Sequence, residues 1–290
     1  MRLDDYRFSE NVTDQRGRSF GGGGMGGGMG LILGLIASRF GIGGVLLLGL
    51  GYFALSFLGG GGSGVAPQEA AGGKSPQEAC SVDAASAFSC RVLASTEDTW
   101  GRLFEQSRQQ YQPARFTFYA GRGDSGCGAA QAAMGPFYCP TDNGIYLDTS
   151  FFAELRSRFG AAGDFAQAYV IAHEVGHHVQ NLTGVLGEAR RRQERLSPAA
   201  ANQAQVRVEL QADCYAGVWA FHNRGRLDPG DVEEGMRAAE AIGDDTLQRA
   251  AQGRVVPESF THGTSAQRMA WLRRGLESGD PAACDTSGAI

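Results

Sequence analysis

The sequence predicts an α+β fold, mostly helical with a small sheet, preceded by one N-terminal transmembrane helix. The helices are predicted by long segments after residue 96 in which apolar residues recur three or four positions apart. The sheet is predicted by two short segments of aromatic and β-branched residues, and the membrane helix by an uncharged apolar stretch. We therefore expect one folded domain behind an anchor.

The composition is that of a globular protein with glycine-rich linkers. Of the 290 residues, 42% are hydrophobic and 20% are charged, and the formal net charge is -5. This acidic balance argues against a nucleic-acid-binding protein, because such proteins carry basic patches. Many of the 44 glycines fall in residues 21–30 and 59–64, where the chain has too few side chains to bury a core.

The predicted anchor lies in residues 31–58. Residues 40–58 contain no charged side chain, and as a helix they would span about 28 Å, close to the hydrocarbon thickness of a bilayer. The apolar character extends back to residue 31, and the stem of Arg39 could reach the interface. A buried core helix and a cleaved signal peptide are the alternatives. Glycine-rich flanks and the lack of a cleavage site after Leu58 favour an uncleaved anchor.

Basic residues set the predicted orientation of this anchor. Five arginines precede residue 40, whereas Lys74 is the only basic residue between Leu58 and Arg91. The positive-inside rule then places the N-terminus in the cytoplasm and the following domain on the extracytoplasmic side of a membrane that the chain crosses once. The predicted organisation is a polar, glycine-rich leader over residues 1–30, the anchor over 31–58, a flexible linker over 59–75 and the folded domain over 76–290.

All six cysteines follow the predicted anchor. An oxidising compartment would allow three disulfides, and short loops favour pairing between nearest neighbours. The sequence alone leaves every other connectivity open, and buried free thiols are the alternative for any pair. The favoured pairs are Cys80–Cys90, Cys127–Cys139 and Cys214–Cys284.

The clearest predicted helix covers residues 164–183, with Asp164 and Gln167 as a capping pair and Gly184 at its end. Other helices are predicted over residues 96–110, over 198–224, from Asp228 to about Gly243, and from Thr264 or Ser265 onward. The predicted strands are residues 115–120 and 145–147, the second of which follows an Asn-Gly turn.

The segment His173-Glu174-Val175-Gly176-His177 lies within the clearest helix. Two histidines four positions apart lie one above the other on a helix, so both imidazoles can bind one metal ion. Glu174 points about 100° around the helix from His173, toward the open side of such an ion. The sequence therefore predicts a Zn²⁺ site with His173 and His177 as ligands and Glu174 as the catalytic general base.

A catalytic zinc ion usually has three protein ligands and one open position. In the second long helix, Glu209 and Asp213 are one turn apart in an apolar, alanine-rich stretch. We assign Glu209 as the third metal ligand and Asp213 as an acceptor that orients a ligand histidine. The reverse assignment, with Asp213 on the metal, is chemically possible and stays open.

Three further histidines are interpreted separately. His178 is expected to face away from the metal, and His222, among apolar neighbours, is expected to be structural. His262 lies in a loop beside Gly263, from which it could reach a cleft and stabilise the oxyanion of a tetrahedral intermediate as a second catalytic residue. A solvent-exposed loop histidine is the alternative. Arg268 could bind a carboxylate or add positive charge nearby.

Longer motifs accompany these residues along almost the whole chain: the leader MRLDDY, a glycine-rich stretch before the anchor, GPFYCP over residues 135–140, HEVGHHVQ over 173–180, ELQADCYAGVW over 209–219 and SFTHGTSAQR over 259–268. On these motifs the chain resembles the bacterial neutral zinc metallopeptidases of the YpfJ type. The resemblance implies a zincin-like, gluzincin-like metallopeptidase domain with two histidines and one glutamate on zinc, and a single N-terminal anchor. Because the family is bacterial, it also implies that the anchor lies in the inner membrane and the catalytic domain in the periplasm.

The expected activity is hydrolysis of a protein or peptide substrate, as an endopeptidase, by Glu174-assisted attack of a zinc-bound water. The strand over residues 145–147 could pair with an extended substrate. A non-peptide amide hydrolase and a zinc-stabilised binding protein without turnover are the alternatives. The binding protein would need a fourth protein ligand and would have no use for Glu174.

Overall fold

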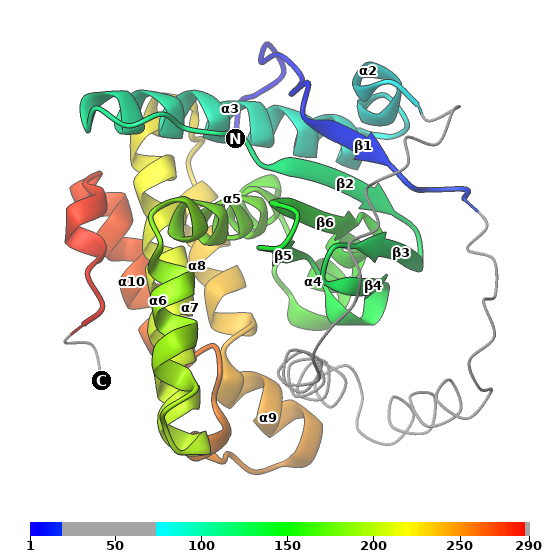
Figure 1. Cartoon of the computed structure of the whole chain (residues 1–290). Coiled ribbons are helices and arrows are strands. Elements are labelled where there is room, and N and C mark those ends of the chain that lie inside the picture. Colours follow the sequence, from blue (N-terminus) through cyan, green and yellow to red (C-terminus); the bar gives the residue numbers. More distant parts are fainter. Residues whose placement is uncertain (19–73, 288–290) are drawn as a thin grey trace.

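The computed structural model describes residues 1–18 and 74–287. Within these residues the fold is α+β with helices in the majority, as the sequence predicts (Figure 1). The strands are β1 (Val12–Asp14), β2 (Arg115–Tyr119), β3 (Arg122–Ser125), β4 (Gly128–Gln131), β5 (Phe137–Cys139) and β6 (Gly144–Asp148). The helices are α2 (Pro76–Cys80), α3 (Ala84–Gln106), α4 (Ser150–Phe159), α5 (Asp164–Leu182), α6 (Val185–Gln193), α7 (Pro198–His222), α8 (Asp231–Ala241), α9 (Asp244–Gln252) and α10 (Ser265–Ser278).

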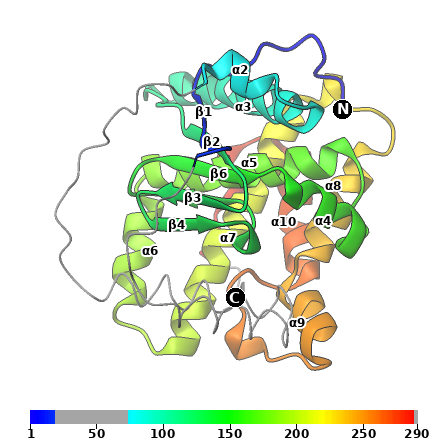
Figure 2. The ribbon, with the colours of Figure 1, turned by 90° about the vertical axis from the view of Figure 1, so that its right-hand side faces the viewer.

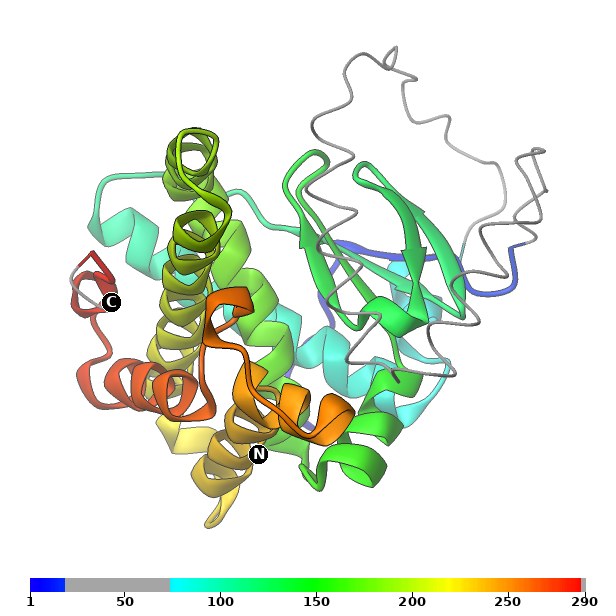
Figure 3. The same ribbon diagram turned by 90° about the horizontal axis from the view of Figure 1, so that it is seen from below.

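Four strands form the main sheet in the order β1-β2-β6-β5, and β3 and β4 form a separate hairpin. Strands β1, β2 and β6 are parallel, and β5 is antiparallel to β6. Every residue of β6 is buried, as is typical of strands covered on both faces. Figure 2 shows α2 and α3 above the sheet. Seen from below, the strands lie on one side of the molecule and α6, α7 and α10 on the other (Figure 3).

The substrate-pairing role expected of residues 145–147 is wrong, because β6 is an inner strand. It pairs with β2 along its whole length and with β5 over residues 144–146. An extended peptide can join a sheet only where a strand has a free backbone edge. Among the residues that the structure describes, the edge strands of this sheet are β1 and β5.

The first residues of the chain belong to the same folded unit as the rest. Strand β1 pairs with β2 in register, with Val12 opposite Phe116. Leu3 is 1% exposed and lies in the main hydrophobic core. The Met1 amino group lies 2.8 Å from the carboxylate of Asp164, at the start of α5. Residues 1–18 therefore supply an edge strand and core side chains to the domain formed by residues 74–287.

This packing corrects the predicted localisation. An anchor that crosses a membrane once separates the residues before it from those after it, yet β1 and β2 lie in one sheet. A cytoplasmic N-terminus with the catalytic domain on the other side is therefore wrong. The structure has no helix that is long and apolar enough to cross a membrane within residues 1–18 and 74–287. The anchor expected over residues 31–58 lies outside the described residues.

Asp14 holds the N-terminal segment in place, and we expect Asp14→Asn to lower the free energy of unfolding at pH 7 by about 2 kcal/mol. Its carboxylate accepts hydrogen bonds from Arg16 and Lys74 at 2.8 and 2.9 Å and is 1% exposed. Burial raises the pKa of Asp14, but Arg16 and Lys74 outweigh it and lower the pKa below its ordinary 3.8. Because the pKa is lowered on folding, the stabilisation is present above pH 3.8 and is lost as the pH falls through the folded-state value.

Urea unfolding at neutral and at acidic pH measures this effect, with the exposed Asp4→Asn as the matched control. The unfolding free energy of the control should stay within about 0.5 kcal/mol of the wild-type value. If the difference in unfolding free energy between wild type and Asp14→Asn is as large at acidic pH as at neutral pH, the stabilising role of the Asp14 carboxylate is contradicted.

The three predicted disulfides are confirmed. Cysteines pair as Cys80–Cys90, Cys127–Cys139 and Cys214–Cys284. The last pair joins α7 to the C-terminal turn Pro281–Cys284 across 70 residues of sequence. This link fixes the C-terminal segment against the helix that carries Glu209 and Asp213.

Helices α5, α7, α8 and α10 lie where the sequence predicts helices, whereas α2, α4, α6 and α9 were not predicted, and the starts of α3 and α5 differ in detail. Helix α3 begins at Ala84 rather than at residue 96, and the side chain of Asp83 caps its start. The sequence did not reveal this first part of the helix, because buried serines occupy inner-face positions where apolar residues would show a helical period. Helix α5 begins without the expected side-chain cap: Gly163 is the N-cap, and Asp164 is the first helical residue.

Candidate metal centre

The candidate site lies where α5 and α7 pack together in the interior of the molecule (Figure 1). Their approach is close because Gly176 lies at the contact. A Cβ atom at this position would lie 2.9 Å from the carbonyl oxygen of Ala212. Side-chain carbons do not pack that close to an oxygen, so the glycine allows the two helices to meet. This contact brings the candidate ligands of α5 against those of α7.

His173, His177 and Glu209 come together, with their ligand atoms within 4.8 Å of one another. Oε2 of Glu209 lies 3.2 Å from Nε2 of His173 and 3.4 Å from Nε2 of His177. Around a tetrahedral Zn²⁺ with bonds of about 2.0–2.1 Å, neighbouring ligand atoms are about 3.3 Å apart. Two imidazole nitrogens and one carboxylate oxygen at this spacing fit a zinc ion, and these three residues could hold one.

Each imidazole uses its other nitrogen in a hydrogen bond that turns Nε2 toward Glu209. Nδ1 of His173 lies 2.8 Å from Oδ1 of Asp213, and Nδ1 of His177 lies 2.9 Å from Oε1 of Gln180. An ionised carboxylate can only accept, so Nδ1 of His173 donates to Asp213. The neutral imidazole held in this way carries its lone pair on Nε2, where a metal ion would need it.

Asp213 is fully buried and is held by opposite charge. Nε and Nη2 of Arg268 lie 2.9 and 2.8 Å from its two oxygens, and the Tyr169 hydroxyl donates to Oδ1 at 2.6 Å. Burial raises the pKa of Asp213, but Arg268 and His173 outweigh it and lower the pKa to about 2. Arg268 was expected either to bind a carboxylate or to add positive charge near the site. In the structure it binds a carboxylate, that of Asp213.

The same network acts on His173. Burial lowers the pKa of its imidazole, but the negative charge of Asp213 and hydrogen bonds to Asp213 and Glu209 raise it to about 9. At neutral pH the metal-free imidazole therefore keeps its second proton. Binding of a metal ion would displace that proton.

The two oxygens of Glu209 have different partners. Oε2 faces both histidines, while Oε1 accepts a hydrogen bond from Gln205 at 2.9 Å. Burial raises the pKa of Glu209, but the charges of His177 and His262 outweigh it and lower the pKa well below its ordinary value. The carboxylate is therefore ionised, with one oxygen turned toward the position a cation would take.

Glu174 and His262 lie beside this group. The Glu174 side chain is buried, with the residue 7% exposed, and its charge acts on His177. His262 acts electrostatically on Glu209, and its side chain is 26% exposed. Asp244, at the start of α9, accepts a hydrogen bond from the backbone nitrogen of His262 at 2.7 Å and lies 3.3 Å from its Nδ1. Asp244 therefore holds the His262 loop at the site.

The remaining two histidines have structural contacts, as the sequence predicts. His178 is fully buried, and its Nε2 donates to the carbonyl oxygen of Gln112 at 2.6 Å while Nδ1 faces the hydroxyl of Tyr138. Nε2 of His222 donates to the carbonyl oxygen of Gly279 at 2.9 Å. Neither histidine is part of the group that could hold a metal.

Sequence reasoning missed four residues that hold the site: Tyr169, Gln180, Gln205 and Asp244. Helical spacing could have indicated three of them. Tyr169 and Gln205 lie one turn before His173 and Glu209, and Gln180 lies one turn after His177. No comparable signal exists for Asp244, because it lies on α9, whereas His262 lies in a loop 18 residues further along the chain.

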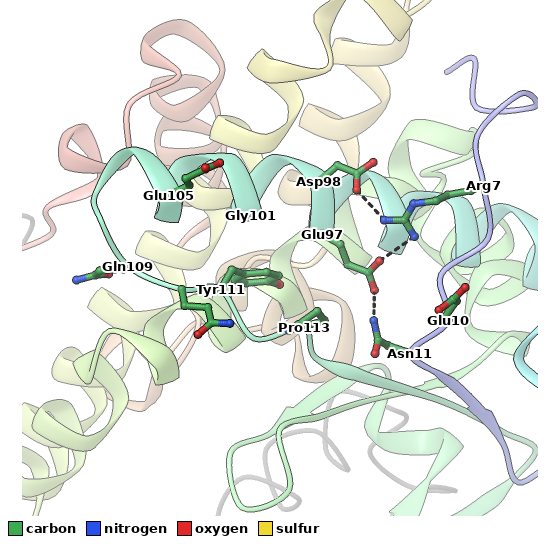
Figure 4. Close-up of a pocket in the computed structure, with 11 residues that line it drawn as sticks. Arg7, Glu10, Asn11, Glu97, Asp98, Gly101, Glu105, Gln109, Tyr111 and Pro113 are labelled. Atoms are coloured by element: carbon green, nitrogen blue, oxygen red, sulfur yellow. Dashed lines mark hydrogen bonds and ion pairs between the residues drawn. The ribbon is translucent and has the colours of Figure 1, made fainter.

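A pocket of about 700 Å³ lies elsewhere, between the N-terminal segment and α3 (Figure 4). Its walls include Glu97 and Asp98, both of which pair with Arg7. Glu97 also accepts a hydrogen bond from Asn11 at 2.8 Å. These carboxylates hold the N-terminal segment on α3, and the pocket includes none of the three residues that could bind a metal.

The fold and site define a class: an α+β protein with two histidines and a glutamate on two packed helices, and a second buried glutamate beside the first histidine. The sequence model of the family described as "Putative neutral zinc metallopeptidase" matches residues 1–287, and the chain belongs to this family.

Two relatives illustrate how far the similarity extends. The chain is 48% identical over 300 residues to "Uncharacterized protein YpfJ" of Escherichia coli (strain K12), with 99% of each chain covered. It is 42% identical over 221 residues to "Uncharacterized protein Rv2575" of Mycobacterium tuberculosis (strain H37Rv), with 72% of this chain and 73% of that protein covered. No solved structure matches the chain.

Proposed function

We propose that the protein is a zinc-dependent endopeptidase. One observation supports this most directly: Oε2 of Glu209 lies at the spacing of a tetrahedral ion from Nε2 of both histidines, while the buried carboxylate of Glu174 lies beside this group and outside it. A structural zinc site has four protein ligands and no use for such a carboxylate. Three ligands leave one position of the metal open to a reacting molecule. The description of the family supports the same chemistry.

In this proposal His173, His177 and Glu209 hold the metal. A Zn²⁺ ion bound there would polarise the scissile carbonyl group and lower the pKa of water. Asp213 acts through His173, whose Nδ1 it binds. The protein supplies a site in which His173 and Glu209 are buried, the side chain of His177 is 13% exposed, and each of the three has a hydrogen-bond partner behind it.

Proton transfer and charge stabilisation are assigned to two other residues. Glu174 takes a proton from the attacking water and delivers it to the nitrogen of the leaving amine as the C–N bond breaks. His262 donates a hydrogen bond to the carbonyl oxygen as negative charge develops there. Asp244 positions His262 through its contacts with the loop.

The ligand assignment is tested by metal content. We expect His177→Ala to reduce bound zinc from about one ion per chain to near zero, because two remaining ligands bind zinc weakly. His222→Ala is the matched control, since it removes a partly buried helical histidine outside the site, whose Nε2 bonds the backbone carbonyl of Gly279 and whose ring packs on Phe221. Elemental analysis of both variants, with turnover of unfolded casein, gives the readout.

The outcomes separate the candidate functions. Equal zinc content in His177→Ala and wild type would contradict the ligand assignment. Wild-type protein that binds zinc but cleaves no peptide would instead support a non-peptide amide hydrolase or a zinc-stabilised binding protein.

A further inference from the structure

We propose that a relay of hydrogen bonds from the C-terminal segment fixes the tautomer and orientation of His177. The relay joins the carbonyl group of Cys284, the side chains of Gln211 and Gln180, and Nδ1 of His177. It rests on the metal site of the proposed function and assigns Gln180 as a positioning residue. His173 has a carboxylate behind it, whereas His177 has this chain of neutral amides.

Backbone carbonyl groups fix the direction of both amides. A carbonyl oxygen can only accept, so the Gln211 atom that lies 3.1 Å from the Cys284 oxygen is the amide nitrogen. The oxygen of Gln211 therefore faces Gln180, at 3.0 Å. In the same way, the carbonyl oxygen of Val208, at 2.7 Å, identifies the amide nitrogen of Gln180.

The oxygen of Gln180 is then the atom that faces His177, and Nδ1 of His177 must donate to it across 2.9 Å. The neutral imidazole consequently keeps its lone pair on Nε2, which lies 3.4 Å from Oε2 of Glu209. Gln180 is fully buried, so its amide has no solvent-exposed alternative to these partners.

Gln180 also couples the two helices that carry the ligands. It lies on α5, one turn after His177, and its nitrogen donates to the carbonyl oxygen of Val208, the residue before Glu209 on α7. The far end of the relay is fixed to α7 as well, because Cys284 is joined to Cys214 by a disulfide. His177 is thereby held relative to Glu209 by contacts from both helices and from the C-terminal segment.

The test is the zinc dissociation constant, measured by competition with a chelator, for wild type and for Gln180→Met. Methionine has a similar length and volume but no hydrogen-bonding amide. We expect zinc to bind about 10–100-fold more weakly, the usual effect of removing the partner behind a metal-binding histidine. The absorption spectrum of the Co²⁺-substituted variant should also change, because the imidazole is no longer held in one orientation.

Gln248→Met is the matched control. Gln248 is another buried glutamine, and its amide contacts Ser259 and the backbone nitrogen of Val256, outside the relay. This variant should lose thermal stability without losing zinc affinity. Gln211→Met serves as the second variant should Gln180→Met fail to fold. It leaves Gln180 bonded to Val208, and we expect zinc affinity to fall about two- to tenfold, as for the loss of one hydrogen bond.

Unchanged zinc affinity and an unchanged Co²⁺ spectrum in a folded relay variant would overturn the relay while leaving the proposed function intact. An equal loss of affinity in Gln248→Met would also overturn it, since the effect would then be one of general stability. Wild-type protein that takes up no zinc would overturn the proposed function, and the relay with it.

Discussion

Glu174→Gln is expected to bind zinc in the same ratio as wild type and to hydrolyse peptides about 10²- to 10⁴-fold more slowly. The substitution keeps the shape of the side chain but removes its basic carboxylate. Because Glu174 is outside the group of residues that could hold the metal, the substitution should leave metal binding intact. Water activation and proton delivery to the leaving amine should fail together. Metal content by elemental analysis, alongside turnover of unfolded casein, measures both properties.

Glu188→Gln is the control for this experiment, because Glu188 is an exposed glutamate on α6 with no place in the site. It should match wild type in both measurements. Near-wild-type turnover in Glu174→Gln would contradict the assignment of Glu174 as general base. Loss of zinc in this variant would mean that Glu174 binds the metal.

Asp213→Ala is expected to affect both stability and zinc binding. The carboxylate is the buried partner of Arg268, so its removal leaves an uncompensated guanidinium in the core and should cost about 3–5 kcal/mol of unfolding free energy. It also removes the acceptor for Nδ1 of His173, which should weaken zinc binding about 10–100-fold. Denaturant unfolding of the metal-free protein and chelator competition separate the two effects.

The double variant Asp213→Ala/Arg268→Met further separates the loss of stability from the loss of zinc affinity. Removing both charges should recover part of the lost stability but none of the zinc affinity. Complete loss of zinc in Asp213→Ala, matching His177→Ala, would favour the reverse assignment, in which Asp213 is the ligand. Wild-type zinc affinity in Asp213→Ala would show that His173 does not depend on this carboxylate.

The sequence was most informative where the chemistry follows from helix geometry. His173 and His177 are one turn apart on a helix with a clear apolar face, so their convergence needs no knowledge of the fold. Glu209 and Asp213 are detectable in the same way, as acidic residues one turn apart in an otherwise apolar stretch. The cysteine pairs followed from proximity along the chain, although Cys214–Cys284 spans 70 residues.

Contacts between distant segments could not be predicted in this way. The N-terminal residues appear polar in sequence, but Leu3 and Val12 are buried against helices and strands far along the chain. Basic residues counted as a topological signal instead make folded contacts, as Arg16 does with Asp14. Asp244 reaches His262 only because α9 folds back on the loop before α10. A periodic pattern carries no information on such packing.

The most direct test of the account is zinc reconstitution of the chelator-treated protein, with cleavage of unfolded casein followed by mass spectrometry. We predict no cleavage without zinc, and a rise to full activity at about one zinc ion per chain. Glu174→Gln should take up the ion and stay inactive throughout the titration. Cleavage that persists in the metal-free protein, or that is equal in His177→Ala and wild type, would contradict a zinc peptidase centred on His173, His177 and Glu209.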